Sequence, residues 1–238
     1  MKVYERVLEK RLRQQVVIGS MQFGFMLGKG TTDTIFTVRQ LQEKHLSKRK
    51  ELYFGFVNLE KAFNQVPREV VRWALRKAGV EEWLVRAVMA LFVDARTFVQ
   101  MASGDSESFK VKVGVHQGSV LSPLLFIIVM DVLSREASEG LPWEVLFADD
   151  MALMAESEQG LMLKLRAWRT AMERKGLKVN AGKSKVMVSA IDAGEMEETG
   201  EYPCGVCCKG VGANSTQCTT CAKWVHRRCS GIAGSLQG

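Results

Sequence analysis

The sequence lacks the features that would mark a membrane or secreted protein. No uninterrupted apolar run approaches the roughly 20 residues that span a bilayer, and the apolar run Leu124–Met130 ends at Asp131. The N-terminus, Met1–Glu5, has no apolar core of the kind that a signal peptide needs. There is also no internal repeat. We therefore expect a soluble, intracellular protein without membrane contact, and the sequence does not distinguish nucleus from cytoplasm.

Cysteine is absent from the chain before Cys204, and all six cysteines fall between Cys204 and Cys229. A disulfide framework is typical of secreted mini-domains, which this chain does not resemble. Metal ligation is the better explanation, because paired Cys-x2-Cys knuckles turn both thiolates toward one zinc ion. The spacing is Cys204-x2-Cys207-x10-Cys218-x2-Cys221-x4-His226-x2-Cys229. Adjacency alone would group the first four of these cysteines around one zinc.

The positive charge is concentrated at the N-terminal end. The chain has 238 residues and a net charge of +7, long enough for one large domain and a small appendage. Residues 1–50 hold eleven Lys and Arg against four Asp and Glu, so the rest of the chain is balanced. A basic region of this kind suits a polyanion such as nucleic acid, and solvated helix faces are the alternative.

Apolar periodicity predicts a mixture of helices and strands. Such mixing favours an α+β fold, in which helices pack on one face of a sheet. The expected helices are 2–16, 31–48, 69–78, 82–92, 121–137 and 159–175. The expected strands are 52–57, 97–101 paired with 109–115, a hairpin within 145–153, and short strands at 177–179 and 185–189.

Two adjacent carboxylates, Asp149 and Asp150, interrupt the apolar stretch Val145–Leu153. Short apolar runs that meet at a polar dipeptide predict a hairpin with the acids at its tip. Neighbouring side chains on extended backbone point to opposite faces, so only one acid can be the main metal ligand on a given face. Acids in such surroundings need solvent, a partner or a cation. An ordinary polar hairpin tip remains the alternative on the dipeptide alone.

Several motifs in order give the chain a resemblance to a known family. They are Gln22–Phe25 with Lys29, Phe56–Pro67, Val115–Leu124, Phe147–Asp150, and Gly176–Asn180 with Lys183. From about residue 2 to 190 the chain resembles the reverse transcriptase of non-long-terminal-repeat (LINE-type) retrotransposons. The resemblance implies a right-hand polymerase palm and fingers built around a ferredoxin-like sheet. It also implies nucleotidyl transfer with two Mg²⁺ ions, an RNA template, a DNA primer and a deoxynucleoside triphosphate.

The resemblance also assigns the metal site. Asp149 is the expected hairpin ligand, with Asp150 beside it, and the facing ligand should follow the strand 52–57. The family has aspartate where this chain has Asn58, and usually where it has Asn64. A neutral amide offers one carbonyl oxygen in place of an anion, so we expect a weakened Mg²⁺ site and impaired or absent polymerase activity.

Other roles follow from the resemblance as well. Phe63 matches the aromatic below the incoming sugar, although a core aromatic explains it equally well. Gln117 and Gly118 match the loop that lines the nucleotide pocket and template, and Lys183 matches a lysine near the triphosphate. Lys29 lies in a glycine-punctuated loop that suits phosphates.

The C-terminal segment resembles the first part of a PHD finger, a cross-braced zinc domain. That resemblance implies one zinc at Cys204, Cys207, His226 and Cys229, and a second, incomplete site at Cys218 and Cys221, with Cys208 unassigned. The expected organisation is reverse transcriptase fingers and palm at 1–190, an acidic linker at 191–203, a half-finger at 204–229 and a tail at 230–238. We expect the fingers to begin upstream and the thumb to be missing. The alternative function is a non-catalytic remnant that binds RNA or a protein, and the partner of the zinc segment is unknown.

Overall fold

The computed structural model describes residues 2–101, 104–137, 144–189, 204, 206, 215–217 and 224–226. The chain divides into two compact units. The first is Met1–Phe36 with Tyr53–Met187, and the second is Thr37–Leu52 with the residues from Val188 onward. Within the described ranges, no helix is long and apolar enough to cross a membrane. The predicted domain boundaries at residues 190 and 204 stay predictions.

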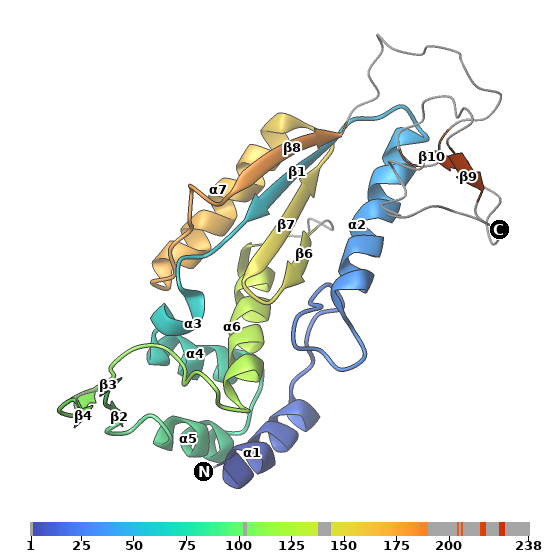
Figure 1. The fold of residues 1–238 in the computed structure, drawn as a ribbon. Coiled ribbons are helices and arrows are strands. Elements are labelled where there is room, and N and C mark those ends of the chain that lie inside the picture. Colours follow the sequence, from blue (N-terminus) through green and yellow to red (C-terminus); the bar gives the residue numbers. More distant parts are fainter. Residues whose placement is uncertain are drawn as a thin grey trace. The chain divides into compact units, whose positions relative to one another are not determined.

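A four-stranded sheet organises the first unit (Figure 1). The strand order is β6 (Glu144–Phe147), β7 (Asp150–Ala155), β1 (Leu52–Val57) and β8 (Lys185–Ser189). Strand β7 runs antiparallel to both β6 and β1, and its register places Met151 opposite Val57. This register brings the residue after β1 next to the first residue of β7.

Helices α6 (Ser122–Ala137) and α7 (Glu158–Arg174) lie on one face of this sheet (Figure 1). Ser157 is the N-cap residue of α7, and its hydroxyl accepts a hydrogen bond from the Gly160 amide. At Gly55 of β1 a Cβ would lie 3.2 Å from Leu161 and Leu165, so glycine lets α7 approach the strand closely. The predicted mixture of helices and sheet is confirmed.

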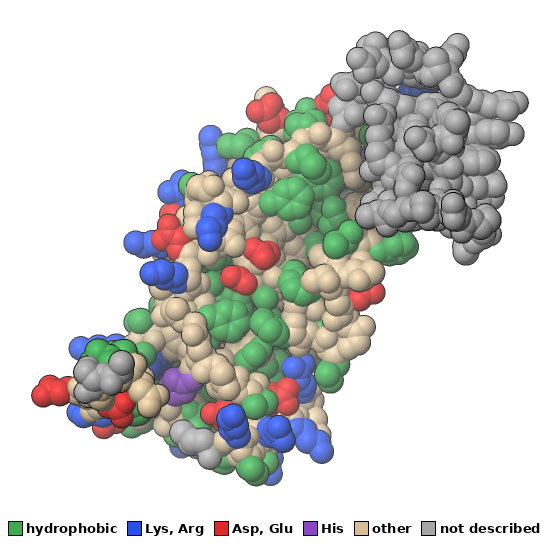
Figure 2. Space-filling model, viewed as in Figure 1, with side chains coloured by type: hydrophobic (Ala, Val, Ile, Leu, Met, Phe, Trp, Pro, Cys, Tyr) green, Lys and Arg blue, Asp and Glu red, His purple; other side chains and the backbone are tan. Residues whose placement is uncertain are grey.

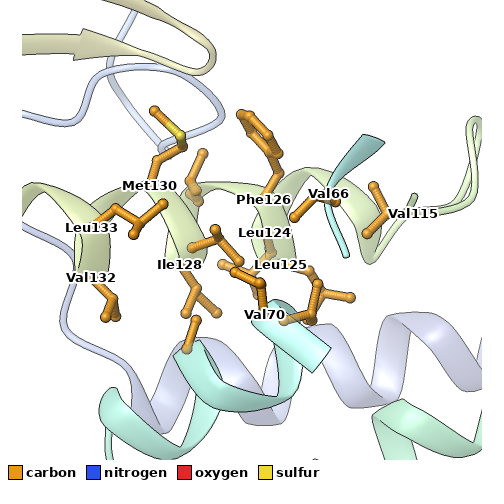
Figure 3. Packing of buried hydrophobic residues seen from close by; sticks show 14 of the residues in the cluster. Val66, Val70, Val115, Leu124, Leu125, Phe126, Ile128, Met130, Val132 and Leu133 are labelled. Carbon is orange, nitrogen blue, oxygen red and sulfur yellow. The ribbon is translucent and has the colours of Figure 1, made fainter. Parts of the chain in front are cut away.

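Helix α6 forms the centre of the core (Figure 3). Its side chains from Leu124 to Leu133 are buried on every side of the helix. A helix that is apolar all round must be covered all round. The sheet layer covers one side, and α4 (Arg68–Lys77) packs on another through Val70, Val71, Ala74 and Leu75.

Sequence periodicity was a weaker guide to the short strands outside the four-stranded sheet. The expected pairing of strand 97–101 with strand 109–115 is found only where β2 (Arg96–Thr97) pairs with β5 (Phe109–Lys110). For the other residues of these two expected strands, all of which the structure describes, the predicted pairing is wrong. At Gly114 the backbone has a φ of 80°, and its amide donates to the Val66 carbonyl instead of to a strand. The expected strand 177–179 is reduced to one bridge, between Leu59 and Val179.

The remaining elements are short or flanking. They are α1 (Lys2–Gln15), α2 (Thr31–Leu46), α3 (Ala62–Gln65), α5 (Glu82–Ala90), β3 (Gln100–Met101), β4 (Gly104–Asp105), β9 (Ser215–Gln217) and β10 (Trp224–His226). In the second unit β9 and β10 pair antiparallel, with Trp224 opposite Gln217.

Only one of the predicted zinc ligands is described with its side chain. Cys204 is buried, and its sulfur accepts a hydrogen bond from the Val206 amide at 3.4 Å. His226 is described through its backbone alone. The other predicted thiol positions lie outside the described residues: Cys207, Cys208, Cys218, Cys221 and Cys229. Both zinc sites therefore stay predictions.

Candidate functional site

The two adjacent acids lie where the sequence predicts them, at the turn of the β6–β7 hairpin. Phe147 pairs with Asp150, so the connecting turn consists of Ala148 and Asp149 alone. Ala148 has a φ of 58°, a conformation that glycine adopts more readily than alanine. Something outside the hairpin must therefore hold the turn in place.

The segment Met21–Gly24 holds it. The Phe23 amide donates to the Leu146 carbonyl at 2.8 Å, and the Leu146 amide donates to the Met21 carbonyl at 2.9 Å. Gln22 is 1% exposed, and its Oε1 accepts from the amides of Gly24 (3.0 Å) and Ala148 (3.2 Å). We expected this segment to form part of a phosphate-binding loop, and nothing in its sequence marks Gln22 as the residue that fixes the turn.

Gly24 explains why the segment fits so closely. A Cβ at this position would lie 2.3 Å from the Ala148 nitrogen, a separation that real side chains do not reach. Lys29 serves the same segment, because its Nζ donates to the carbonyls of Ser20 (2.5 Å) and Gln22 (3.1 Å). The glycine-punctuated loop therefore braces the hairpin, and phosphate binding by Lys29 stays a prediction.

The structure brings Asn58 against Asp150. The Asn58 Nδ2 donates a hydrogen bond to Asp150 Oδ1 at 2.8 Å. The contact follows from the register of β1 and β7, and Asp150, not Asp149, is the acid that Asn58 touches. Figure 2 shows acidic side chains surrounded by apolar ones on the sheet face opposite α6 and α7.

Asp149 occupies a different environment from its neighbour. Partial burial raises the pKa of the Asp149 carboxyl, and the negative charge of Asp150 raises it further, while a backbone hydrogen bond opposes both effects. Asp150 itself is exposed. The pair therefore presents one carboxylate bound by an amide and one whose ionised form is disfavoured by its surroundings.

The loop that carries Lys183 adjoins Asn58 from the other side. The Asn180 amide donates to the Asn58 carbonyl at 2.8 Å, and the Lys183 amide donates to the Asn180 carbonyl at 3.2 Å. The Ser184 hydroxyl accepts from the Asn58 amide at 3.4 Å. The Lys183 side chain is exposed beside this turn. Three predicted site residues, Asn58, Asp150 and Lys183, therefore gather at one end of the sheet.

Phe63 belongs to an aromatic group at the edge of the core. Its ring stacks on Phe126 with centroids 4.4 Å apart, and Phe25 meets it edge-on at 5.9 Å. It is only half-buried. The core interpretation is thus supported, and contact with a sugar stays a prediction.

Gln117 and Gly118 lie on an exposed loop that other residues position. Gln117 Nε2 donates to Asn64 Oδ1 at 2.8 Å, so the second degenerate position orients the predicted template-facing amide. Gly118 has a φ of 79°, which requires glycine-like freedom.

Glu5 of α1 anchors the same loop from the other end. Its Oε2 accepts from the Ser119 hydroxyl (2.9 Å) and the Val120 amide (3.2 Å), and the side chain is 7% exposed. Sequence reasoning missed this contact. A signal was present, because Glu5 shares the apolar stripe of Leu8 and Leu12 at helical spacing.

Comparisons with known proteins match this chain to one family of polymerases. A sequence profile of the family described as "Reverse transcriptase (RNA-dependent DNA polymerase)" matches residues 1–219. The Pol polyprotein of the type-1 retrotransposable element R2 from Nasonia vitripennis is 25% identical over 184 residues, covering 74% of this chain and 18% of the relative. That of element R2DM from Drosophila melanogaster is 30% identical over 186 residues, with the same coverage.

Further relatives extend the likeness. The RNA-directed DNA polymerase from the mobile element jockey of Drosophila funebris is 29% identical over 198 residues, covering 76% of this chain and 21% of the relative. The chain thus spans about a fifth of the length of these relatives. Apo telomerase from Candida tropicalis has a similar fold, with a TM-score of 0.61, 14% identity, and coverage of 77% of this chain and 39% of that one.

Proposed function

The chain belongs to the reverse transcriptase (RNA-dependent DNA polymerase) family, and from that premise we propose that it is a retrotransposon polymerase palm with an impaired catalytic centre. It is a reverse transcriptase domain homologous to the polymerases of the R2 and jockey elements. The proposed partners are an RNA template, a DNA primer and a deoxynucleoside triphosphate.

The hydrogen bond between Asn58 and Asp150 carries the proposal of impairment. Reverse transcriptases generally use Mg²⁺, and two-metal transfer needs anionic oxygens on both sides of the cations. Here the residue after β1 points an N–H donor at Asp150 Oδ1, 2.8 Å away. In this orientation the amide presents a donor that cannot ligate a cation, and after a turn of the side chain it would offer one neutral oxygen in place of an anion. The residues present therefore do not fit a pair of divalent cations.

The consequence for the reaction is a loss of charge and of positioning. Asn58 leaves Asp149 and Asp150 as the only acids of the expected set, and burial disfavours ionisation of Asp149. A displacement of the reacting atoms by ~1 Å costs on the order of 10²-fold in rate, and loss of electrostatic stabilisation adds to this. We expect polymerase activity to be absent or strongly reduced, with Mg²⁺ held weakly.

The other site residues keep roles that do not depend on the cations. Gln117, oriented by Asn64, and Gly118 are proposed to face the template and nucleotide. Phe63 is proposed to lie below the incoming sugar, and the exposed cation of Lys183 near the triphosphate. Lys29 is proposed to contact phosphates, and to do so its Nζ must leave the carbonyls of Ser20 and Gln22 that it binds in this structure.

A second candidate function is binding without catalysis, by a remnant that holds RNA or a protein. The hydrogen bond between Asn58 and Asp150 favours this second function, because it gives the Asp150 carboxylate a partner without a cation. The proposed zinc segment belongs to either function, with one complete site at Cys204, Cys207, His226 and Cys229 and a partial one at Cys218 and Cys221. Elemental analysis tests the tail, where two tightly held zinc ions per chain would contradict a half-built second site.

Primer extension on an RNA template, with Mg²⁺ or Mn²⁺, tests the proposed impairment. The unmodified chain should incorporate no nucleotide above background, and the variant Asn58→Asp, with or without Asn64→Asp, should gain incorporation. Clear incorporation by the unmodified chain would contradict the proposal. A silent Asn58→Asp variant that still binds template and primer would show that Asn58 is not the lesion.

A further inference from the structure

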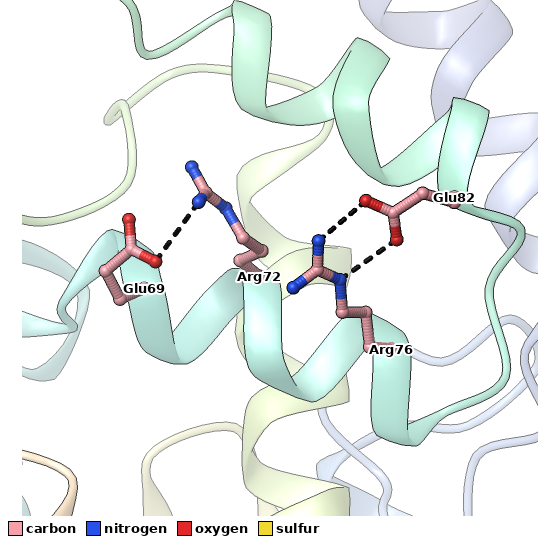
Figure 4. Close-up of polar contacts among 4 residues, drawn as sticks. All are labelled: Glu69, Arg72, Arg76 and Glu82. Carbon is pink, nitrogen blue, oxygen red and sulfur yellow. Dashed lines mark hydrogen bonds and ion pairs between the residues drawn. The ribbon is translucent and has the colours of Figure 1, made fainter.

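A cationic hollow of about 290 Å³ lies on the exposed side of α4. Figure 4 shows three of its lining side chains, Glu69, Arg72 and Arg76. Its lining residues recur at helical spacing, so they share one face of the helix. They are Glu69, Arg72, Trp73, Arg76 and Lys77. The buried aliphatic side chains of α4 (Val70, Val71, Ala74 and Leu75) face α6 instead, and none of the lining residues belongs to the hairpin site.

Ion pairs engage the arginines of this hollow. The Nε and Nη2 atoms of Arg76 donate to both oxygens of Glu82, from α5, at 2.9 and 2.6 Å. These hydrogen bonds lower the pKa of Glu82, so the pair stays charged at neutral pH. Arg72 lies 3.4 Å from Glu69. Each guanidinium has five N–H donors, so a second edge of each remains available to an anion.

A fourth cation adjoins the hollow. Lys175, at the end of α7, has its Nζ 3.5 Å from the ring centroid of Trp73. Four cations therefore surround the half-buried tryptophan against two carboxylates. The cations are Arg72, Arg76, Lys77 and Lys175, and the carboxylates are Glu69 and Glu82. The excess of positive charge suits an anionic partner.

We propose that this hollow is a second nucleic-acid contact, which binds the phosphate backbone of single-stranded RNA. Arginine forks match phosphate oxygens, and a cationic groove with an aromatic side chain is the usual architecture of single-strand binding. A polyanion already engaged by a polymerase palm reaches a second site on the same unit at high effective concentration. The inference rests on the RNA binding proposed above and adds a second site to it, and it requires no catalytic competence.

The test is binding of a labelled, 20-nucleotide single-stranded RNA by the full chain, in buffer without Mg²⁺, followed by fluorescence anisotropy across a salt series. The double variant Arg72→Gln with Lys77→Gln removes two cations from the hollow. The matched control, Arg166→Gln with Arg169→Gln on α7, removes the same charge from another exposed helix face. The control is close in detail, since Arg169 pairs with Glu173 as Arg72 pairs with Glu69.

The hollow variant should bind about 10-fold more weakly at 0.1 M salt, and the slope of log K against log salt should shrink by about 1.4, for two phosphate contacts. The control should stay within about twofold of the unmodified chain, and the charge-conserving swap Arg72→Lys with Lys77→Arg should restore binding. Equal losses in both double variants would overturn the proposal in favour of net charge. Preferential binding of a poly-aspartate peptide at the hollow would also overturn it, as would no RNA binding by the unmodified chain.

Discussion

The substitution Asn58→Asp gives the most informative perturbation of the hairpin site. It places an oxygen where Nδ2 now donates to Asp150 Oδ1 at 2.8 Å. Two carboxylates about 4 Å apart repel by about 1 kcal/mol in water and by about 4 kcal/mol at an effective dielectric constant of 20. The side chains are partly exposed, so the lower part of this range applies, and the lost hydrogen bond adds about 1 kcal/mol. We expect a destabilisation of about 2 kcal/mol without divalent cations.

Cations should reverse the effect in the variant alone. A loss of about 2 kcal/mol corresponds to a decrease of about 4–8 °C in Tm for a domain of this size. Mn²⁺ at 100 times its Kd would return about 2.7 kcal/mol by mass action. The assay is thermal unfolding followed by circular dichroism, with and without Mn²⁺ and at constant zinc. The unmodified chain should shift by less than about 1 °C on Mn²⁺ addition, because its Asp150 already has a partner.

The matched control is Asn64→Asp, which adds the same charge on the same unit. Asn64 accepts a hydrogen bond from Gln117 through Oδ1, and aspartate keeps that acceptor. Its stability should change by less than about 0.5 kcal/mol, with no response to Mn²⁺. The reasoning is refuted if both variants lose the same stability, or if Asn58→Asp gains no response to the cation.

Two further predictions concern the hairpin turn. Gly24→Ala should lower the free energy of unfolding by about 2 kcal/mol or more, because its Cβ would overlap the Ala148 backbone. Gly30→Ala should be nearly neutral, because its Cβ would lie at an ordinary contact distance of 3.8 Å from the Asp33 carboxylate. Chemical denaturation measures both, and equal effects would contradict the close approach at Gly24. Asp149→Asn should stabilise the chain, because burial makes the ionised form of Asp149 unfavourable and raises its pKa. A group with a raised pKa in the folded state loses stability on deprotonation, so the gain from the variant should increase as pH rises through that pKa. A stability difference between the two proteins that does not vary with pH would contradict this prediction.

Local sequence patterns predicted the parts of the fold that depend on local physics. The apolar runs on either side of Asp149 and Asp150 predicted the hairpin, and the uninterrupted apolar character of Leu124–Met130 predicted the buried helix α6. The ladder expected at 109–115 failed for a non-local reason. Its alternation is real, yet the Gly114 amide bonds to Val66, a residue far away in the sequence.

The contacts within the site could not be predicted from the sequence, because they too depend on residues far apart along the chain. Motif order identified Asn58 and Asp150 as site positions, but their hydrogen bond depends on the register between β1 and β7. The role of Gln22 depends on which backbone amides meet a buried side-chain oxygen, and that oxygen serves a turn more than 120 residues away. Glu5, in contrast, carried a readable signal as an acid within a buried helical stripe.

The central claim is that the Asn58 amide has replaced a cation-binding group at the hairpin. Direct titration with Mn²⁺, read by electron paramagnetic resonance of the free ion, tests this claim on the full chain. We predict weak binding by the unmodified chain and binding at least about 10-fold tighter by Asn58→Asp, since an added anionic ligand next to Asp150 supplies charge that the amide cannot. Equal and tight binding by the two proteins would contradict the account.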